Sequence, residues 1–105
     1  MIKHVVAFKF RSEISDLDQQ YIFAALNSFP DDYPTMRNWT LAPNSSNRDD
    51  TMSHAFIVEF DTRADLDAYL TGAAHEKFVQ EVWRPAVKTQ IIVTLESVGS
   101  IADSE

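Results

Sequence analysis

The sequence contains no cysteine, and only two of its 105 residues are glycine. Without cysteine the chain can have no disulfide, no thiol nucleophile and no thiolate metal site, which is typical of a reducing compartment, so we expect a cytoplasmic protein. Basic residues are also few, because nine lysines and arginines stand against sixteen acidic residues and leave a net charge of -7. Nucleic acids and anionic membranes bind clustered positive charge, so we expect neither as a partner.

Long apolar runs are missing as well. The N-terminal segment includes Lys3, His4 and Lys9 and has neither a long apolar stretch nor a cleavage site, so the sequence predicts no signal peptide and no membrane span. A chain of this length is expected to form one domain with a sizeable core. We predict that residues 1–99 form this domain and that residues 100–105 are a polar C-terminal tail.

Apolar periodicity predicts secondary structure in the order β-α-β-β-α-β. Strands are expected over residues 2–10, 36–41, 54–60 and 89–98. Polar N-caps at Ser15 and Thr62 predict where the two helical regions begin. The first helix has a wide apolar stripe, which consists of Leu17, Tyr21, Ile22, Ala24, Ala25, Leu26 and Phe29.

This order is that of the ferredoxin-like split βαβ sandwich, an α+β fold in which helices cover one face of a four-stranded antiparallel sheet. On the first strand, the face predicted to meet the helices carries Ile2, His4, Val6, Phe8 and Phe10. The opposite face of the sheet is predicted to carry Val5, Ala7, Ala55, Ile57 and Ile92. Because so apolar a patch is costly in water on a small domain, we expect a second copy to cover it in a two-fold homodimer.

The stretch from His54 to Phe78 combines a predicted strand with a capped helix. Thr62 caps this helix, and Leu66, Tyr69 and Leu70 follow at the spacing of a buried stripe, which turns Tyr69 inward. A tyrosine in this position is a core residue whose hydroxyl can reach the edge of a cavity.

Two histidines are predicted to lie near this tyrosine. Gly72 marks a break between two helical segments, and His75 lies at that break. His4 is on the strand face assigned to the helices, so His4, Tyr69 and His75 are expected to line one cavity. A neutral histidine, with an ordinary pKa of about 6.5, can take a proton from a carbon between two carbonyls, and a tyrosine hydroxyl can hold the carbonyl oxygen.

Several short motifs, spread over nearly the whole chain, match the pattern of a known family. They are the opening Ile2-Lys3-His4-Val5-Val6, the polar Asn44-Ser45-Ser46, His54 at the start of the third strand, and Tyr69 followed by His75 and Phe78. In these features the chain resembles the stress-response A/B barrel (Dabb) family of dimeric α/β-barrel proteins. Relatives usually have His-Pro-x-His where this chain has Gly72-Ala73-Ala74-His75, so only the second histidine is kept.

The resemblance implies a dimeric barrel made of two ferredoxin-like subunits. A plant polyketide cyclase that resembles this domain uses the tyrosine and histidine matching Tyr69 and His75, and it closes a linear polyketide thioester by aldol condensation without a cofactor. The resemblance therefore implies catalytic roles for His75 and Tyr69, with His4 beside them, and no metal or other cofactor. A small apolar carbonyl-containing ligand would contact Val6, Phe8, Phe23, Phe56, Leu70 and Phe78.

Other interpretations of the same residues stay open. Tyr69 also fits as a core aromatic, His75 as a helix cap and His4 as a histidine at the edge of the core. At the level of function, the alternative is a non-catalytic, stress-associated dimeric assembly or binding protein, and a haem or quinol-type barrel enzyme is a third class without a ligand motif. A metal site made by His4, His54 and His75 is not expected, because antiparallel strands place the first two at opposite ends of the sheet.

Overall fold

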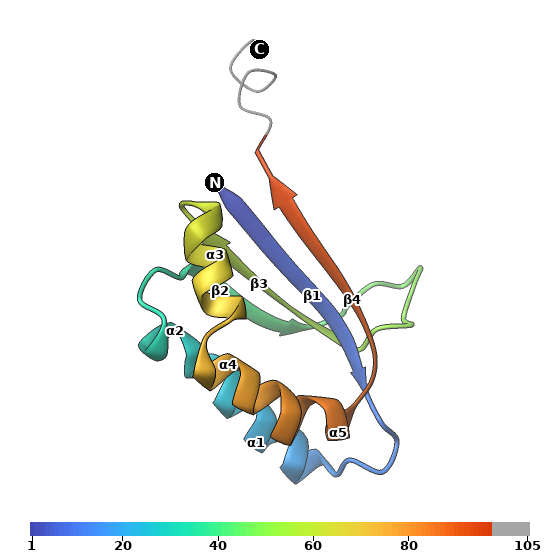
Figure 1. The fold of residues 1–105 in the computed structure, drawn as a ribbon. Helices are drawn as coiled ribbons and strands as arrows, with labels where there is room; N and C mark the ends of the chain where they lie inside the picture. The colour runs from blue at the N-terminus through green and yellow to red at the C-terminus, as the bar shows by residue number, and fades with distance from the viewer. Residues whose placement is uncertain (98–105) are drawn as a thin grey trace.

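The computed structural model describes residues 1–97, and within them the predicted ferredoxin-like fold is confirmed. Four antiparallel strands form one sheet in the order β2-β3-β1-β4. The strands are β1 Ile2–Phe10, β2 Arg37–Pro43, β3 His54–Phe60 and β4 Val87–Glu96. The helices are α1 Asp16–Asn27, α2 Phe29–Asp32, α3 Arg63–Leu70, α4 Ala73–Phe78, the π-helical turn η1 Val79–Trp83, and α5 Arg84–Ala86. All helices lie on one face of the sheet, and β4 runs along its edge (Figure 1).

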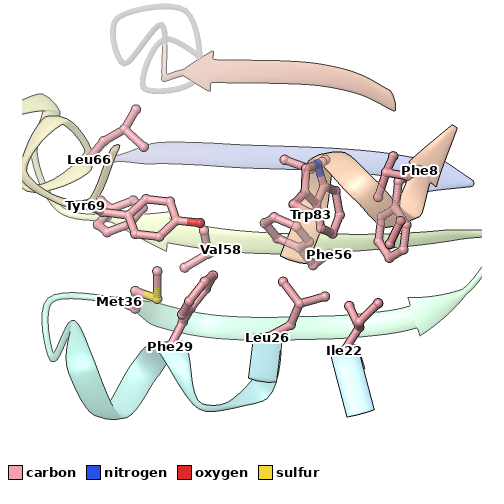
Figure 2. Packing of buried hydrophobic residues seen from close by; sticks show 14 of the residues in the cluster. Phe8, Ile22, Leu26, Phe29, Met36, Phe56, Val58, Leu66, Tyr69 and Trp83 are labelled. Carbon is pink, nitrogen blue, oxygen red and sulfur yellow. The ribbon is translucent and has the colours of Figure 1, made fainter. Parts of the chain in front are cut away.

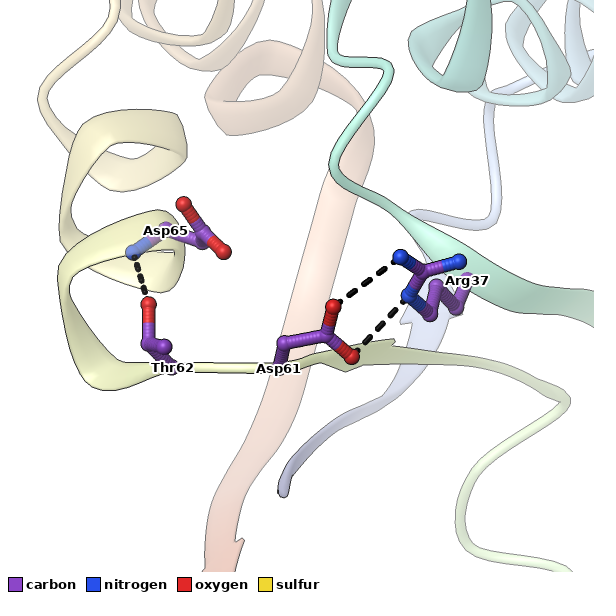
Figure 3. A network of polar contacts seen from close by, with 4 residues as sticks. All are labelled: Arg37, Asp61, Thr62 and Asp65. Carbon is purple, nitrogen blue, oxygen red and sulfur yellow. Dashed lines mark hydrogen bonds and ion pairs between the residues drawn. The ribbon is translucent and has the colours of Figure 1, made fainter.

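Both predicted N-caps are confirmed. The Ser15 hydroxyl accepts a hydrogen bond from the Asp18 N–H at 3.1 Å, and the Thr62 hydroxyl accepts one from the Asp65 N–H at 3.2 Å. Next to the second cap, Asp61 forms a two-pronged ion pair with Arg37 of β2, with N–O distances of 3.0 and 2.9 Å (Figure 3). This pair is exposed and adds little stability, but together with the cap it fixes where α3 leaves the sheet.

The apolar stripe of α1 is narrower than predicted. Ile22 and Leu26 are buried, whereas Leu17 is 80% exposed and Tyr21 is 76% exposed. At about 100° per residue, Leu17 lies about 140° around the helix from Ile22 and so points away from the sheet. A helix that packs on one side of a sheet buries only a stripe, and the prediction for Leu17 and Tyr21 was therefore wrong.

The core lies between the sheet and the helices, as Figure 2 shows for Phe8, Phe56, Val58 and Trp83. On β1 every even-numbered residue is buried, and His4 is the one polar or charged residue that is buried within residues 1–97. Alternation along β1 and β3 thus gives one face to the core and leaves the other uncovered by helices.

The uncovered face differs in one strand from the prediction. Residues paired directly across antiparallel strands share a face, and Val5 pairs with both Ile57 and Val93. Ile91, Val93 and Leu95 therefore carry this face onto β4, each with between 41% and 52% of its surface exposed. Ile92 instead pairs with Val6 and lies on the helix side, so its predicted place on the uncovered face was wrong.

The break between α3 and α4 falls at Gly72 as predicted, although for a different reason than backbone freedom. Gly72 has a φ of -66°, which any residue adopts. A side chain at this position would overlap the hydroxyl of Tyr33, and this hydroxyl accepts the His75 N–H at 3.2 Å. Lack of a side chain is therefore what position 72 requires.

The last strand begins and ends earlier than predicted, at Val87 and Glu96 rather than at residues 89 and 98. The predicted polar tail, residues 100–105, lies outside the described part of the chain, as do residues 98 and 99 of the predicted domain. No helix within residues 1–97 has the length and apolar character needed to cross a membrane.

Candidate functional site

A cavity of about 310 Å³ lies between the sheet and the helices. Most of its lining is apolar, with a few polar groups, as in many small-molecule sites. The lining residues are His4, Val6, Leu26, Phe29, Phe56, Tyr69, Leu70, His75, Phe78, Val79, Trp83, Gln90, Ile92 and Thr94. Gln90, Ile92 and Thr94 are exposed, so β4 forms the solvent-facing rim of the cavity.

His4, Tyr69 and His75 meet at one end of this cavity. The ring centres of Tyr69 and His75 are 4.4 Å apart, and those of His4 and Tyr69 are 6.3 Å apart, with edge-to-face geometry. The three residues come from β1, α3 and α4, and the capped start of α3 and the space at Gly72 bring them together. Tyr69 is 1% exposed and points along the sheet from α3 (Figure 2).

His75 is oriented by two backbone contacts. Its backbone N–H donates to the Tyr33 hydroxyl, and its ring Nδ1 lies 3.1 Å from the Leu70 backbone carbonyl oxygen. Because a carbonyl can only accept, Nδ1 carries the proton and Nε2 is left as the basic nitrogen. Burial lowers the pKa of His75, partly offset by this hydrogen bond and by Glu76, so the ring is neutral at pH 7.

Tyr69 and His4 are held in their neutral forms as well. Burial raises the pKa of Tyr69, and the nearby Tyr33 raises it further, so its hydroxyl keeps its proton. Burial lowers the pKa of His4, and repulsion from Arg63 and from His75 when His75 is protonated lowers it further. The His4 Nδ1 is 3.0 Å from the Thr94 hydroxyl, which can donate or accept.

Four of the six residues predicted to contact a ligand line the cavity, namely Val6, Phe56, Leu70 and Phe78. Phe8 and Phe23 do not. Phe8 is fully buried, with its ring centre 4.8 Å from that of Trp83, which separates it from the open space. Phe23 packs at the far end of the sheet against His54, with ring centres 4.8 Å apart.

His54 lies away from the other histidines. It pairs with Phe8 across β1 and β3, whereas His4 pairs with Val58, so the two histidines are at opposite ends of the strand pair. Its ring stacks on Phe8 with centres 5.7 Å apart, and its Nδ1 is 2.8 Å from the Ser53 hydroxyl. Among residues 1–97 no cluster of three histidine, aspartate or glutamate side chains could hold a metal ion.

Sequence reasoning missed the parts of the lining that come from β4 and from the last helical turns. Trp83 was not among the residues predicted to contact a ligand, yet it lines the cavity, and its indole N–H donates to the Gln90 side chain at 2.8 Å. It lies in a π-helical turn, in which one additional residue per turn changes the phase of the helix. An apolar pattern with a period of 3.6 residues carries no signal for such a change.

The comparisons with known proteins agree with this fold. The sequence profile of the Stress responsive A/B Barrel Domain (Dabb) matches residues 2–97. The chain therefore belongs to the Dabb family. No curated protein matches it.

Three solved structures illustrate the likeness. A Dabb family protein from Mesorhizobium loti with a ferredoxin-like fold is 19% identical, with a TM-score of 0.83 over 93% of this chain and 97% of its own. The hydroxynitrile lyase from Passiflora edulis is 20% identical, with a TM-score of 0.82 over 90% of each chain. A dimeric ferredoxin-like protein of unknown function from Thermobifida fusca is 16% identical, with a TM-score of 0.78 over 91% of this chain and 90% of its own. At these identities the likeness concerns the fold.

Proposed function

We propose that the protein is a homodimeric lyase or cyclase that carries out acid–base chemistry on a small carbonyl compound in the apolar cavity. The observation that carries this proposal is the orientation of His75. Its Nδ1–H is committed to the Leu70 carbonyl, and its ring centre is 4.4 Å from that of Tyr69. A neutral base and a neutral hydroxyl donor thus stand side by side at the wall of a cavity lined mainly by apolar groups.

An aldol-type reaction needs these two groups. His75 Nε2 takes a proton from the carbon next to a carbonyl, and the resulting enolate attacks a second carbonyl carbon to form the new carbon–carbon bond. The Tyr69 hydroxyl donates a hydrogen bond to the oxygen on which negative charge develops. The protonated His75 then returns its proton to the product alkoxide, and cleavage follows the same steps in reverse.

His4, on β1, can assist from the sheet side of the cavity. It is 4% exposed and lies edge-on to Tyr69, so a hydrogen bond from its ring to the substrate would help to fix the carbonyl against the tyrosine. The apolar lining excludes water and thereby strengthens the hydrogen bonds to the developing charge. Chemistry of this kind relies on side chains alone.

Three of the similar structures support the proposal. The Passiflora edulis neighbour is a hydroxynitrile lyase. Neighbours from Bacteroides fragilis and Thermobifida fusca are described as dimeric. In this chain the face suited to a dimer contains Val5, Ala7, Ile57, Ile91, Val93 and Leu95.

The experiment measures turnover of three variants with a panel of carbonyl substrates that includes polyketide-like thioesters and cyanohydrins. Tyr69→Phe removes the hydroxyl at the cavity, His75→Ala removes the base, and Tyr21→Phe removes an exposed hydroxyl on α1 as the matched control for Tyr69→Phe. We expect Tyr69→Phe and His75→Ala to lower turnover by at least about 100-fold, the usual range for an acid–base group, with little change in the melting temperature of His75→Ala. If neither Tyr69→Phe nor His75→Ala changes turnover, this mechanism is refuted.

The uncovered sheet face favours a second candidate, a non-catalytic dimeric assembly or binding protein. In that case the apolar row on β4, Ile91, Val93 and Leu95, is the functional surface and His75 only helps to join α3 to α4. This alternative predicts that His75→Ala lowers stability without any chemical consequence. Thermal melts and the substrate panel on the same variant therefore separate the two functions.

A further inference from the structure

A second hollow, of about 340 Å³, adjoins the apolar cavity and has a different character. Its lining includes Arg11, just after β1, Arg84 of α5 and Lys88 of β4. No aspartate or glutamate is among its lining residues, all of which lie in the described part of the chain. Three of the nine basic residues of an acidic chain therefore gather at one place.

Within residues 1–97 these three cations have no carboxylate partner, since the two ion pairs found there involve other arginines. Arg11 is held by the backbone of the last helical turn. Its N–H donates to the Ala86 carbonyl at 2.8 Å, and its guanidinium Nη2 donates to the Arg84 carbonyl at 3.5 Å. Like charges held together repel one another and create a local positive potential, and a bound anion relieves that repulsion.

Trp83 and Gln90 line both the hollow and the cavity. The Trp83 indole N–H donates to the Gln90 side-chain oxygen at 2.8 Å, so this pair forms a partition between the two spaces. Gln90 is exposed on the edge strand β4, so its side chain can turn toward solvent when the hydrogen bond to Trp83 breaks. One ligand can then extend from the apolar space into the basic one.

We propose that the two spaces form a single elongated site for an amphipathic ligand. The apolar body occupies the cavity, and a terminal carboxylate or phosphate binds to Arg11, Arg84 and Lys88. Arginine suits both groups because its guanidinium forms paired, charge-assisted hydrogen bonds with them. The inference rests on the proposed function, since it requires the cavity to bind a ligand, and it specifies the substrate class as anionic carbonyl compounds.

Trp83 provides the signal for a binding test. The chain has two tryptophans, so Trp39→Phe leaves Trp83 as the only one. In this background, binding of octanoate, octyl phosphate and 1-octanol is followed by fluorescence. We expect all three probes to bind, and the tighter-binding of the two anions to bind at least about tenfold more tightly than octanol. Added salt should weaken the binding of the two anions and leave the binding of octanol unchanged. The comparison of octanoate with octyl phosphate identifies which anion the hollow prefers.

Charge removal then locates the anion. The double variant Arg84→Gln with Lys88→Gln should weaken binding of the preferred anion about tenfold or more and leave octanol unaffected. Arg48→Gln, which removes one positive charge from the exposed loop between β2 and β3, is the control. It should change neither the binding of the anion nor the binding of octanol. Equal weakening by Arg48→Gln, or no weakening by the double variant, would overturn the inference.

Three further outcomes separate this inference from the proposed function. If octanol binds but the anions gain nothing over it, the cavity stands as a ligand site and only the joined site fails. If inorganic phosphate binds to the hollow without competing with octyl phosphate, the hollow is a separate anion site and the inference again fails. If no probe binds at all, the cavity itself fails, and with it the proposed function.

Discussion

Replacing Gly72 with alanine tests how the junction of α3 and α4 positions His75. An added Cβ would overlap the Tyr33 hydroxyl and would stand 2.9 Å from the Tyr33 Cζ. The φ of -66° suits alanine, so the cost comes from the contact rather than from the backbone. When the Tyr33 ring is displaced, the His75 N–H in the first turn of α4 loses its acceptor.

The magnitude follows from opposing contributions. Overpacking costs about 1–3 kcal/mol, and loss of the hydrogen bond costs about 0.5–1.5 kcal/mol. Alanine also stiffens the unfolded chain, which offsets about 0.4–1 kcal/mol of this loss. We therefore expect the free energy of unfolding to fall by roughly 0.5–4 kcal/mol, and each kcal/mol lowers the melting temperature of a domain this size by about 4–8 °C. Thermal unfolding followed by circular dichroism measures the change.

The double variant Gly72→Ala with Tyr33→Phe provides the control. Without the Tyr33 oxygen the worst overlap disappears, so the double variant should be more stable than the sum of the two single losses predicts. Alanine is also a poorer N-cap for α4 than glycine, but this cost is the same with either ring. Additive losses, or a Gly72→Ala protein that melts at or above the temperature of the parent, would refute the steric explanation.

Three other predictions concern pH, assembly and local structure. Because the pKa values of His4 and His75 are lowered from 6.5 in the folded chain, the unfolded chain binds more protons at low pH. The free energy of unfolding should thus be highest above about pH 6.5 and should fall below it, and melts from about pH 8 to pH 5 that stay flat would contradict this. Ile57→Lys should weaken the proposed dimer in sedimentation, since a two-fold interface receives the buried charge twice, whereas Leu17→Lys on the exposed side of α1 should leave it intact. Thr62→Ala should lower the free energy of unfolding by about 0.5–2 kcal/mol through loss of the α3 cap, and denaturant titration beside the exposed control Thr51→Ala checks it.

The parts of the fold that depend on local chemistry could be predicted from the sequence. Ser15 and Thr62 cap their helices through hydrogen bonds to residues three positions ahead, which a sequence displays directly. Strict alternation along β1 likewise gives its buried face. In each case the signal and the structure lie within a few residues of one another.

The face of β4 could not be predicted in this way. Ile91, Ile92 and Val93 are apolar in succession, so alternation gives no phase there. Only the pairing with β1, where Val6 lies opposite Ile92, decides which side chains reach the cavity. This pairing joins residues far apart in the chain, and it also explains why Gln90 and Thr94 were missed.

For the candidate site, the types of residue were easier to predict than its extent. Tyr69 and His75 follow from helical spacing and from the break at Gly72, and His4 follows from alternation. The size and shape of the cavity depend on Phe8, which is covered by Trp83, and on the ring positions of Phe29 and Phe56. Such packing is a property of the whole core and has no local pattern.

The π-helical turn Val79–Trp83 places one residue more in the cavity wall than an α-helical turn would. Because the extra residue widens the turn, the residues that follow keep nearly the same direction around the helix axis as they would have in an α-helix without it. Deleting one exposed residue, such as Gln80, would let an ordinary α-helix form through this segment with Trp83 still directed toward Gln90. The wall of the cavity therefore tolerates the loss of one residue at this turn.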